Sequence, residues 1–242
     1  MKGMPPAARA IHREMMALRS PARAALLRRF FKTGPGEYGE GDVFLGLTVP
    51  EVRRLVRDRA PGATLKDAGA LLASAFHEER LAALLLLVEL FRRGGDRERE
   101  RIYRFYLGHT KRINNWDLVD LSAPSIVGAW LAGRDRRILD RLARSKSLWE
   151  RRIAVVATFH FIREGDLAPT LRLAAALLRD PHDLIHKAAG WMLREAGKRD
   201  LPALERFLSR HAGTMPRTML RYAIERLPER RRRAWLAGSA PV

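Results

Sequence analysis

Residues 136–165 read RRILDRLARSKSLWERRIAVVATFHFIREG, and the spacing of their apolar side chains decides the fold class. A short apolar pattern over residues 136–143 is followed by a longer one, in which Ser147 and Glu150 have the spacing of a helix capping box and Gly165 marks the end. Apolar residues recur three and four positions apart in both segments, which is the period of amphipathic helices. The stretch therefore predicts a helical hairpin.

Similar hairpins are predicted along the whole chain. The most apolar helices are expected to begin near Glu78, Trp116, Leu148, His182 and Met215, at intervals of 38, 32, 34 and 33 residues by subtraction. Two helices in a repeat of this length are typical of α-solenoids, and strand-like alternation is nearly absent. We predict an all-α fold of tandem antiparallel helical hairpins, stacked in a curved α-solenoid with a basic concave groove. An irregular helical bundle is the alternative that the spacing leaves open.

No change of composition and no long linker divides the 242 residues, so we expect a single domain over residues 1–242. The C-terminal stretch 229–242, ERRRRAWLAGSAPV, is predicted to be a basic cap or tail of that domain. A glycine-rich segment, residues 34–46, precedes a capped helix and is expected to form a mobile or tightly turned loop that carries Tyr38 and Asp42. It lacks the patterns of phosphate-binding loops, and a plain interhelical connection is the simpler interpretation.

The charge of the chain points to a polyanionic partner. Lys and Arg number 46 against 27 Asp and Glu, which gives a formal net charge of +19. Such an excess costs self-repulsion unless an anionic partner offsets it, so nucleic acid is the first expectation and an anionic membrane the second. The absence of cysteine excludes disulfides, thiolate metal sites and a cysteine nucleophile.

The apolar runs of the sequence do not predict a membrane protein. The longest run, residues 81–88, is far shorter than the roughly 20 residues that a membrane-spanning helix needs. The first 20 residues also lack the uninterrupted apolar segment of a signal peptide. We therefore expect a cytoplasmic protein, associated with the nucleoid through DNA.

A carboxylate in the predicted basic groove needs a specific reason. In the stretch NNWDLVD, Trp116 and Asp120 are four residues apart and share one helix face, within about 6 Å at their Cβ atoms. Asp120 would repel DNA phosphates, so it is expected either to orient Arg152 through an ion pair or to stabilise a transient cation or activate water. The simpler interpretation is a Trp in the core and an Asp paired at the surface.

Basic and aromatic residues of later repeats are candidates for DNA contacts. Arg151 and Arg152 follow the basic residue Lys146, and the planar guanidinium of Arg152 suits a phosphate. Trp191 follows the small residues of KAAGWMLREAGK, where helices can approach closely, and it is expected either to pack in the core or to offer a π face to a base, a sugar or a cation. The histidines lack metal-ligand spacing, so we expect no metal.

Four stretches in order carry a resemblance to a known family: FLGLTVPEVRRL at 44–55, NNWDLVDLSAPSIVG at 114–128, SLWERRIAVV at 147–156 and IHKAAGWMLREAGK at 185–198. Together they resemble the AlkD family of DNA alkylation repair proteins, which are DNA glycosylases built from HEAT-like repeats. By this resemblance Trp116, Asp120 and Arg152 are the catalytic residues, and Trp191 lines the same groove. The family's N-terminal aromatic contact has no secure counterpart in the glycine-rich stretch, where Tyr38 is the candidate.

The resemblance implies a monofunctional alkylpurine DNA glycosylase of base excision repair. Such a hydrolase releases cationic 7-methylguanine or 3-methyladenine from duplex DNA, without a cofactor and without a deep pocket for a flipped base, and we expect it to act as a monomer. A non-catalytic repeat protein that binds distorted or branched DNA is the alternative function, and a scaffold for an acidic peptide is the third. The residues expected to bind DNA are Trp191, Lys187, Arg151, Lys146, Arg53, Arg54 and Tyr38.

Overall fold

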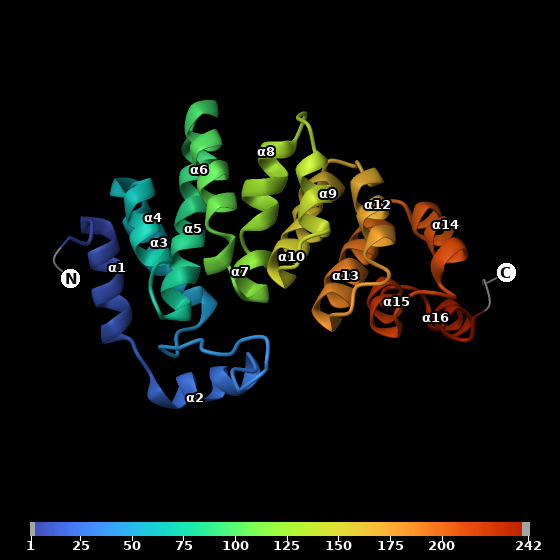
Figure 1. Cartoon of the computed structure of the whole chain (residues 1–242), viewed down its shortest axis with the longest axis horizontal. Coiled ribbons are helices and arrows are strands. Elements are labelled where there is room, and N and C mark those ends of the chain that lie inside the picture. The colour runs from blue at the N-terminus through green and yellow to red at the C-terminus, as the bar shows by residue number, and fades with distance from the viewer. Residues whose placement is uncertain (1–2, 239–242) are drawn as a thin grey trace. The chain divides into compact units, whose positions relative to one another are not determined.

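The computed structural model describes residues 3–238, and its regular structure over them is helical (Figure 1). A single parallel bridge joins Val43 to Phe76, and the described residues form no strand. The all-α prediction is therefore confirmed. The chain divides into two compact units, Met1–Ile126 and Val127–Val242. The single domain expected over residues 1–242 stays a prediction.

The first unit is organised around one long helix. Helix α5 contacts α3, α4, α6 and α7, and its apolar stretch 81–87 is buried throughout, because the residues around the whole circumference of this helix are covered by its neighbours. The helices of this unit are α1 Pro6–Ala17, α2 Pro21–Phe30, α3 Val49–Arg59, α4 Leu65–Leu72, α5 His77–Arg93, α6 Asp96–Gly108 and α7 Trp116–Asp120, with short 3₁₀ turns η1 Ala60–Gly62 and η2 Thr110–Arg112.

In the second unit helices that follow one another in the chain pack against each other. Helix α9 packs on α10, α12 packs on α13, and α13 also contacts α14 and α15. The elements are the π-helical turn η3 Pro124–Gly128 at the unit boundary, α8 Ala129–Leu131, α9 Arg137–Ala143, α10 Leu148–Ala157, α11 Phe159–Arg163, α12 Ala168–Ala176, α13 Asp183–Arg199, α14 Leu201–His211, α15 Arg217–Ala223 and α16 Glu229–Leu236. These hairpins are those of an α-solenoid of helical repeats, as the sequence predicted, whereas the basic concave groove stays a prediction.

The predicted helix starts agree closely with the structure. Helices α5, α7, α10 and α13 begin within one residue of the predicted positions, and α15 begins two residues after Met215. Thr48 and Glu51 form a complete capping box, and the Ser147 hydroxyl accepts a hydrogen bond from the backbone N–H of Glu150. The spacing of these residues in the sequence therefore predicted the hydrogen bonds at the start of both helices.

The close helix approach expected around Trp191 is present in the second unit. A Cβ atom on Gly190 of α13 would lie 2.5 Å from the carbonyl oxygen of Met219 and 2.6 Å from Cβ of Tyr222. No side chain fits at that distance, so glycine lets α13 and α15 pack backbone against backbone.

The C-terminal stretch contains one more helix. Helix α16 carries a run of arginines and buries Trp235, which is 4% exposed. The predicted cap or tail over 229–242 therefore includes a packed helix, and residues 239–242 lie outside the described residues. In the described part of the chain, every helix is too short or too polar to cross a membrane.

Candidate functional site

Trp116 and Asp120 line one cavity of the first unit. They are the first and last residues of α7, which has only five residues and begins where the side-chain oxygen of Asn115 accepts a hydrogen bond from the backbone N–H of Trp116 at 2.8 Å. The cavity has a volume of about 430 Å³, and both side chains contribute to its wall. The structure therefore brings these two predicted residues together, and their catalytic roles stay predictions.

Aromatic rings form one wall of this cavity. The ring of Phe31 stacks on Trp116, with centroids 5.2 Å apart and planes 20° apart, and Phe30 meets Trp116 edge-on at 6.0 Å. Phe44 also stacks on Phe31, with ring centroids 5.1 Å apart. Trp116 is half-buried in this cluster, so part of the indole stays accessible to a ligand. The remaining apolar lining comes from Leu27, Leu47, Val49, Leu81 and Leu121.

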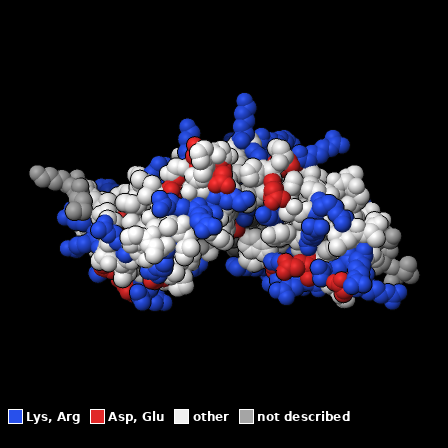
Figure 2. Space-filling model, turned by 90° about the horizontal axis from the view of Figure 1, so that it is seen from below, with Lys and Arg blue, Asp and Glu red and all other residues white. Residues whose placement is uncertain are grey.

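The ionisable groups of the cavity differ from those of the surrounding protein. Its described lining residues include three carboxylates, Glu78, Asp117 and Asp120, together with His77, and no Lys or Arg. The chain as a whole carries a net charge of +19, and Lys and Arg side chains are spread over the visible face of the molecule (Figure 2). An acidic and aromatic cavity favours a cation or a neutral apolar group over a phosphate.

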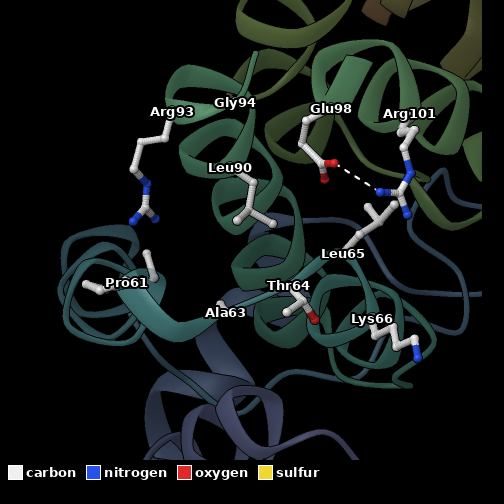
Figure 3. Close-up of a pocket in the computed structure, with 11 residues that line it drawn as sticks. Pro61, Ala63, Thr64, Leu65, Lys66, Leu90, Arg93, Gly94, Glu98 and Arg101 are labelled. Atoms are coloured by element: carbon white, nitrogen blue, oxygen red, sulfur yellow. Dashed lines mark hydrogen bonds and ion pairs between the residues drawn. The ribbon is translucent and has the colours of Figure 1, made fainter. Parts of the chain in front are cut away.

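Two other cavities of the same unit show the contrast. One lies against η1, α4, α5 and α6 and is lined by Lys66, Arg93 and Arg101, with Glu98 paired to Arg101 (Figure 3). The other is lined by Arg19 and Arg28 among apolar residues. Cavities with basic linings are thus ordinary in this chain, and the cavity beside Trp116 differs from them.

Glu78 accepts hydrogen bonds from backbone N–H groups beside the cavity. Its carboxylate is 2% exposed and accepts hydrogen bonds from the backbone N–H groups of Leu45, Gly46 and Leu47 at 2.9, 2.8 and 3.2 Å. This satisfies donors that burial would otherwise leave without a partner. The segment before α3 is therefore tied to the first turn of α5.

His77 connects two carboxylates beneath the aromatic wall. Its Nδ1 lies 3.1 Å from Asp42 and its Nε2 lies 2.8 Å from Asp117, and all three side chains are buried. Burial by itself lowers the pKa of His77, but the charge and hydrogen bond of Asp117, with those of Asp42, outweigh it and raise the pKa from 6.5 to about 9. At neutral pH the imidazole is therefore a cation, in contact with the carboxyl groups of Asp42 and Asp117.

Asp42 stays ionised in this buried position. Burial raises the pKa of this carboxyl, but the hydrogen bond from His77 and the charge of Arg80 outweigh burial and hold the pKa below 3.8. Arg80 donates a hydrogen bond to Asp42 at 2.6 Å. Asp42 therefore lies against two positively charged side chains, those of His77 and Arg80.

The glycine-rich segment is tightly turned. The backbone N–H of Gly39 donates to the carbonyl of Lys32 at 3.1 Å, and that of Asp42 donates to Gly39 at 3.0 Å. Gly36 and Gly41 have positive φ angles, 75° and 81°, which glycine adopts without strain. Tyr38 lies half-buried in this segment, outside the lining of the cavity.

Arg151 and Arg152 belong to α10 in the second unit and lie in different surroundings. Arg151 is held by Asp180 through Nε at 2.6 Å and also donates to the carbonyl oxygens of Ser145 and Lys146. Arg152 is 5% exposed, and its Nη1 donates to the carbonyl oxygen of Leu184 at 2.5 Å. Arg151 therefore has a structural ion pair, which competes with the phosphate contact predicted for it.

The other predicted DNA-binding residues lie on several helices. Lys146 is exposed just before α10, and Arg53 and Arg54 are exposed on α3. Lys187 of α13 forms an ion pair with Asp183 at 2.9 Å. Trp191, half-buried on the same helix, packs against Phe159 with centroids 5.7 Å apart. Their convergence with Trp116 and Asp120 on one groove, and the Asp120–Arg152 ion pair, stay predictions.

Sequence reasoning missed the aromatic wall and the buried histidine. Phe30 ends α2 and Phe31 follows it, outside the four stretches that carry the family resemblance, and only the folded chain places them on Trp116. A signal for His77 existed, because the run HEER at 77–80 sets four ionisable residues directly before the most apolar stretch of the chain. All four are buried. Across residues 3–238, no group of three or more His, Asp or Glu could hold a metal ion.

Comparisons with solved structures support the fold, and the comparison with family models shows the family. A predicted DNA alkylation repair enzyme from Enterococcus faecalis has a similar solved structure, with a TM-score of 0.68 and 18% sequence identity over 87% of this chain and 97% of that chain. The solved structure of smu.31 from Streptococcus mutans UA159 is also similar, with a TM-score of 0.54 and 16% identity over 86% of this chain and 96% of that chain. At these identities the likeness shows the fold. No curated protein matches the sequence. Residues 11–227 match the model of the DNA alkylation repair enzyme family, and the chain therefore belongs to that family.

Proposed function

We propose that this protein is a DNA repair glycosylase that hydrolyses the N-glycosidic bond of cationic alkylated purines, such as 7-methylguanine and 3-methyladenine, in duplex DNA. The observation that carries the proposal is the cavity of Trp116 and Asp120, which is aromatic and acidic and has no Lys or Arg among its described lining residues, in a chain of charge +19. Binding to a DNA duplex requires only cationic side chains that neutralise phosphates. Binding of a cationic base is instead favoured by aromatic π faces and carboxylates.

The chemistry needs few protein groups. Alkylation at N7 of guanine or N3 of adenine makes the base cationic, so it leaves with the electron pair of the glycosidic bond and becomes neutral without a general acid. Water then forms the new bond to the sugar carbon and loses a proton, which leaves an abasic site. Asp120 stabilises the positive charge that develops on the deoxyribose and orients or deprotonates the water, while Trp116 offers its π face to the cation.

Basic residues outside the cavity bind the duplex. In this proposal the exposed Lys146, Arg53 and Arg54 contact the phosphate backbone, whereas Arg152, which is 5% exposed, is held inside the protein by its bond to Leu184. Affinity for any duplex then falls steeply with salt, because each phosphate contact releases counterions. The protein works as a monomer without a cofactor, in the cytoplasm on the nucleoid.

The test is release of free base from a duplex that contains one 7-methylguanine, measured by chromatography with mass detection. The wild-type protein is expected to release the base, and Asp120→Asn to lower the single-turnover rate by about 10²- to 10⁴-fold, the range of a lost general base, while duplex affinity is retained. Asp58→Asn, which changes an exposed carboxylate of α3 outside the cavity, is the matched control and keeps full activity.

The outcomes separate the proposed function from the alternatives. Salt-dependent duplex binding by the wild-type protein without release of base would instead support a non-catalytic protein that binds distorted or branched DNA. Full activity in Asp120→Asn would remove the catalytic role of this carboxylate. If the wild-type protein binds no duplex at all, the remaining alternative function is a scaffold that binds an acidic peptide.

A further inference from the structure

Asp42 joins three separate segments of the first unit. One of its carboxylate oxygens lies 3.1 Å from Nδ1 of His77 and 3.0 Å from Nδ2 of Asn115, and the other accepts from Arg80 at 2.6 Å and from Asn114 at 3.3 Å. The glycine-rich segment, the start of α5 and the residues before α7 are therefore held by one side chain. Asp42 is 7% exposed, so water competes little for these contacts.

His77 connects Asp42 to Asp117, the residue that follows Trp116 in the chain. Its Nε2 meets Oδ2 of Asp117 at 2.8 Å, and Oδ1 of Asp117 accepts from the backbone N–H of Leu118 at 2.9 Å. Asn115, which contacts Asp42, caps the backbone of Trp116. The residues immediately before and after Trp116 are thus both bound to the same buried group.

Helix α7 cannot hold its own orientation. It has five residues, and a single helical turn gains too few hydrogen bonds to be stable by itself. The chain then enters the π-helical turn η3 at Pro124. The positions of Trp116 and Asp120 must therefore come from contacts with other elements.

We propose that Asp42, His77 and Asp117 form a buried positioning relay, which fixes the first turn of α7 to the glycine-rich segment and to α5 and so sets where Trp116 and Asp120 face the cavity. A buried ionic group of this kind is costly to desolvate and adds little stability over apolar packing, which suits a role in fixing geometry. The imidazole also supports the aromatic wall, because its centroid lies 5.0 Å from Phe31 and 4.6 Å from Phe44.

The relay rests on the proposed glycosylase function for its kinetic test, and a second measurement does not depend on activity. His77→Gln and Asp42→Asn are compared with the matched control His12→Gln. His12 makes the same kind of contact with α5, Nδ1 to Glu79 at 2.6 Å, but Glu79 has no bond to α7. His77→Gln and His12→Gln therefore both remove a contact between a histidine and a carboxylate that involves a residue of α5.

The first measurement is single-turnover release of 7-methylguanine at saturating protein, with duplex affinity measured in parallel. Because misplacement of a reacting group by about 1 Å can cost roughly a hundredfold in rate, His77→Gln is expected to lose on the order of a hundredfold in rate, with duplex affinity changed by no more than about twofold. His12→Gln keeps the wild-type rate. An equal loss in both variants, or none in His77→Gln, would overturn the relay.

The second measurement is hydrogen exchange of the backbone amides of Trp116–Asp120. His77→Gln is expected to speed exchange there by about tenfold or more relative to the rest of the first unit, whereas His12→Gln leaves it unchanged. If His77→Gln does not fold, Asn114→Ala, which removes the contact of a half-buried side chain with Asp42, takes its place in both measurements. If the wild-type protein releases no base but the variants show these differences in exchange, the proposed glycosylase function is wrong and the relay stands. If exchange in His77→Gln is unchanged, the relay itself is wrong.

Discussion

The free energy of unfolding is expected to fall as the pH rises from 6.5 to 9, and His77 is the group responsible. Its pKa is raised from 6.5 to about 9 in the folded chain, because Asp117 and Asp42 favour the protonated ring more than burial disfavours it. A raised pKa means that the folded state binds the proton more tightly than the unfolded state. The stabilisation is therefore fully present below pH 6.5 and is lost as the pH passes through about 9.

The size of the effect follows from the two pKa values. A rise from 6.5 to about 9 is worth about 3–4 kcal/mol in all at roughly 1.4 kcal/mol for each unit of pKa, and about 3 kcal/mol of this is lost between pH 6.5 and 9. The carboxylate of Asp42 does not contribute in this interval, since its pKa lies below 3.8 and its stabilisation is lost only in acid. A change of about 3 kcal/mol is a large part of the stability of a typical domain.

Urea unfolding, followed by circular dichroism between pH 6.5 and 9, measures this change. The wild-type protein is expected to lose about 3 kcal/mol across the interval, and His77→Gln to be less stable at pH 6.5 but nearly constant with pH. His12→Gln is the control, and it keeps the wild-type slope because His77 and its two carboxylates are intact. Equal slopes in the wild type and in His77→Gln would show that another group causes the loss and would refute the reasoning.

Two further predictions concern packing and buried hydrogen bonds, both measured by urea unfolding. Gly190→Ala is expected to lower stability by about 1–3 kcal/mol, because the new Cβ would lie 2.5 Å from the carbonyl of Met219, whereas Gly108→Ala, where nothing lies within 4 Å, is neutral or stabilising. Glu78→Gln is expected to cost about 1–3 kcal/mol, because one amide oxygen cannot replace two carboxylate oxygens that accept from the N–H groups of residues 45–47. A loss in Gly108→Ala as large as in Gly190→Ala, or an unchanged Glu78→Gln, would contradict these explanations.

Local signals along the sequence determined the helices of this protein. The period of apolar residues predicted the hairpins, and the capping residues Thr48 and Ser147 were predicted from their spacing to Glu51 and Glu150. These features depend on residues that are three or four positions apart, so the sequence alone contains them. The spacing of Trp116 and Asp120 placed both on one helix for the same reason.

Contacts between distant segments were decided only by the tertiary structure. Phe31 reaches Trp116 across 85 positions by subtraction, and His77 meets Asp42 and Asp117 from helices and loops that no short pattern connects. The ionisation of His77 likewise depends on contacts with Asp42 and Asp117, which lie 35 and 40 positions away in the chain. The sequence therefore determined which groups the cavity has available, and folding decided which of them meet, since their meeting depends on packing between segments far apart in the chain.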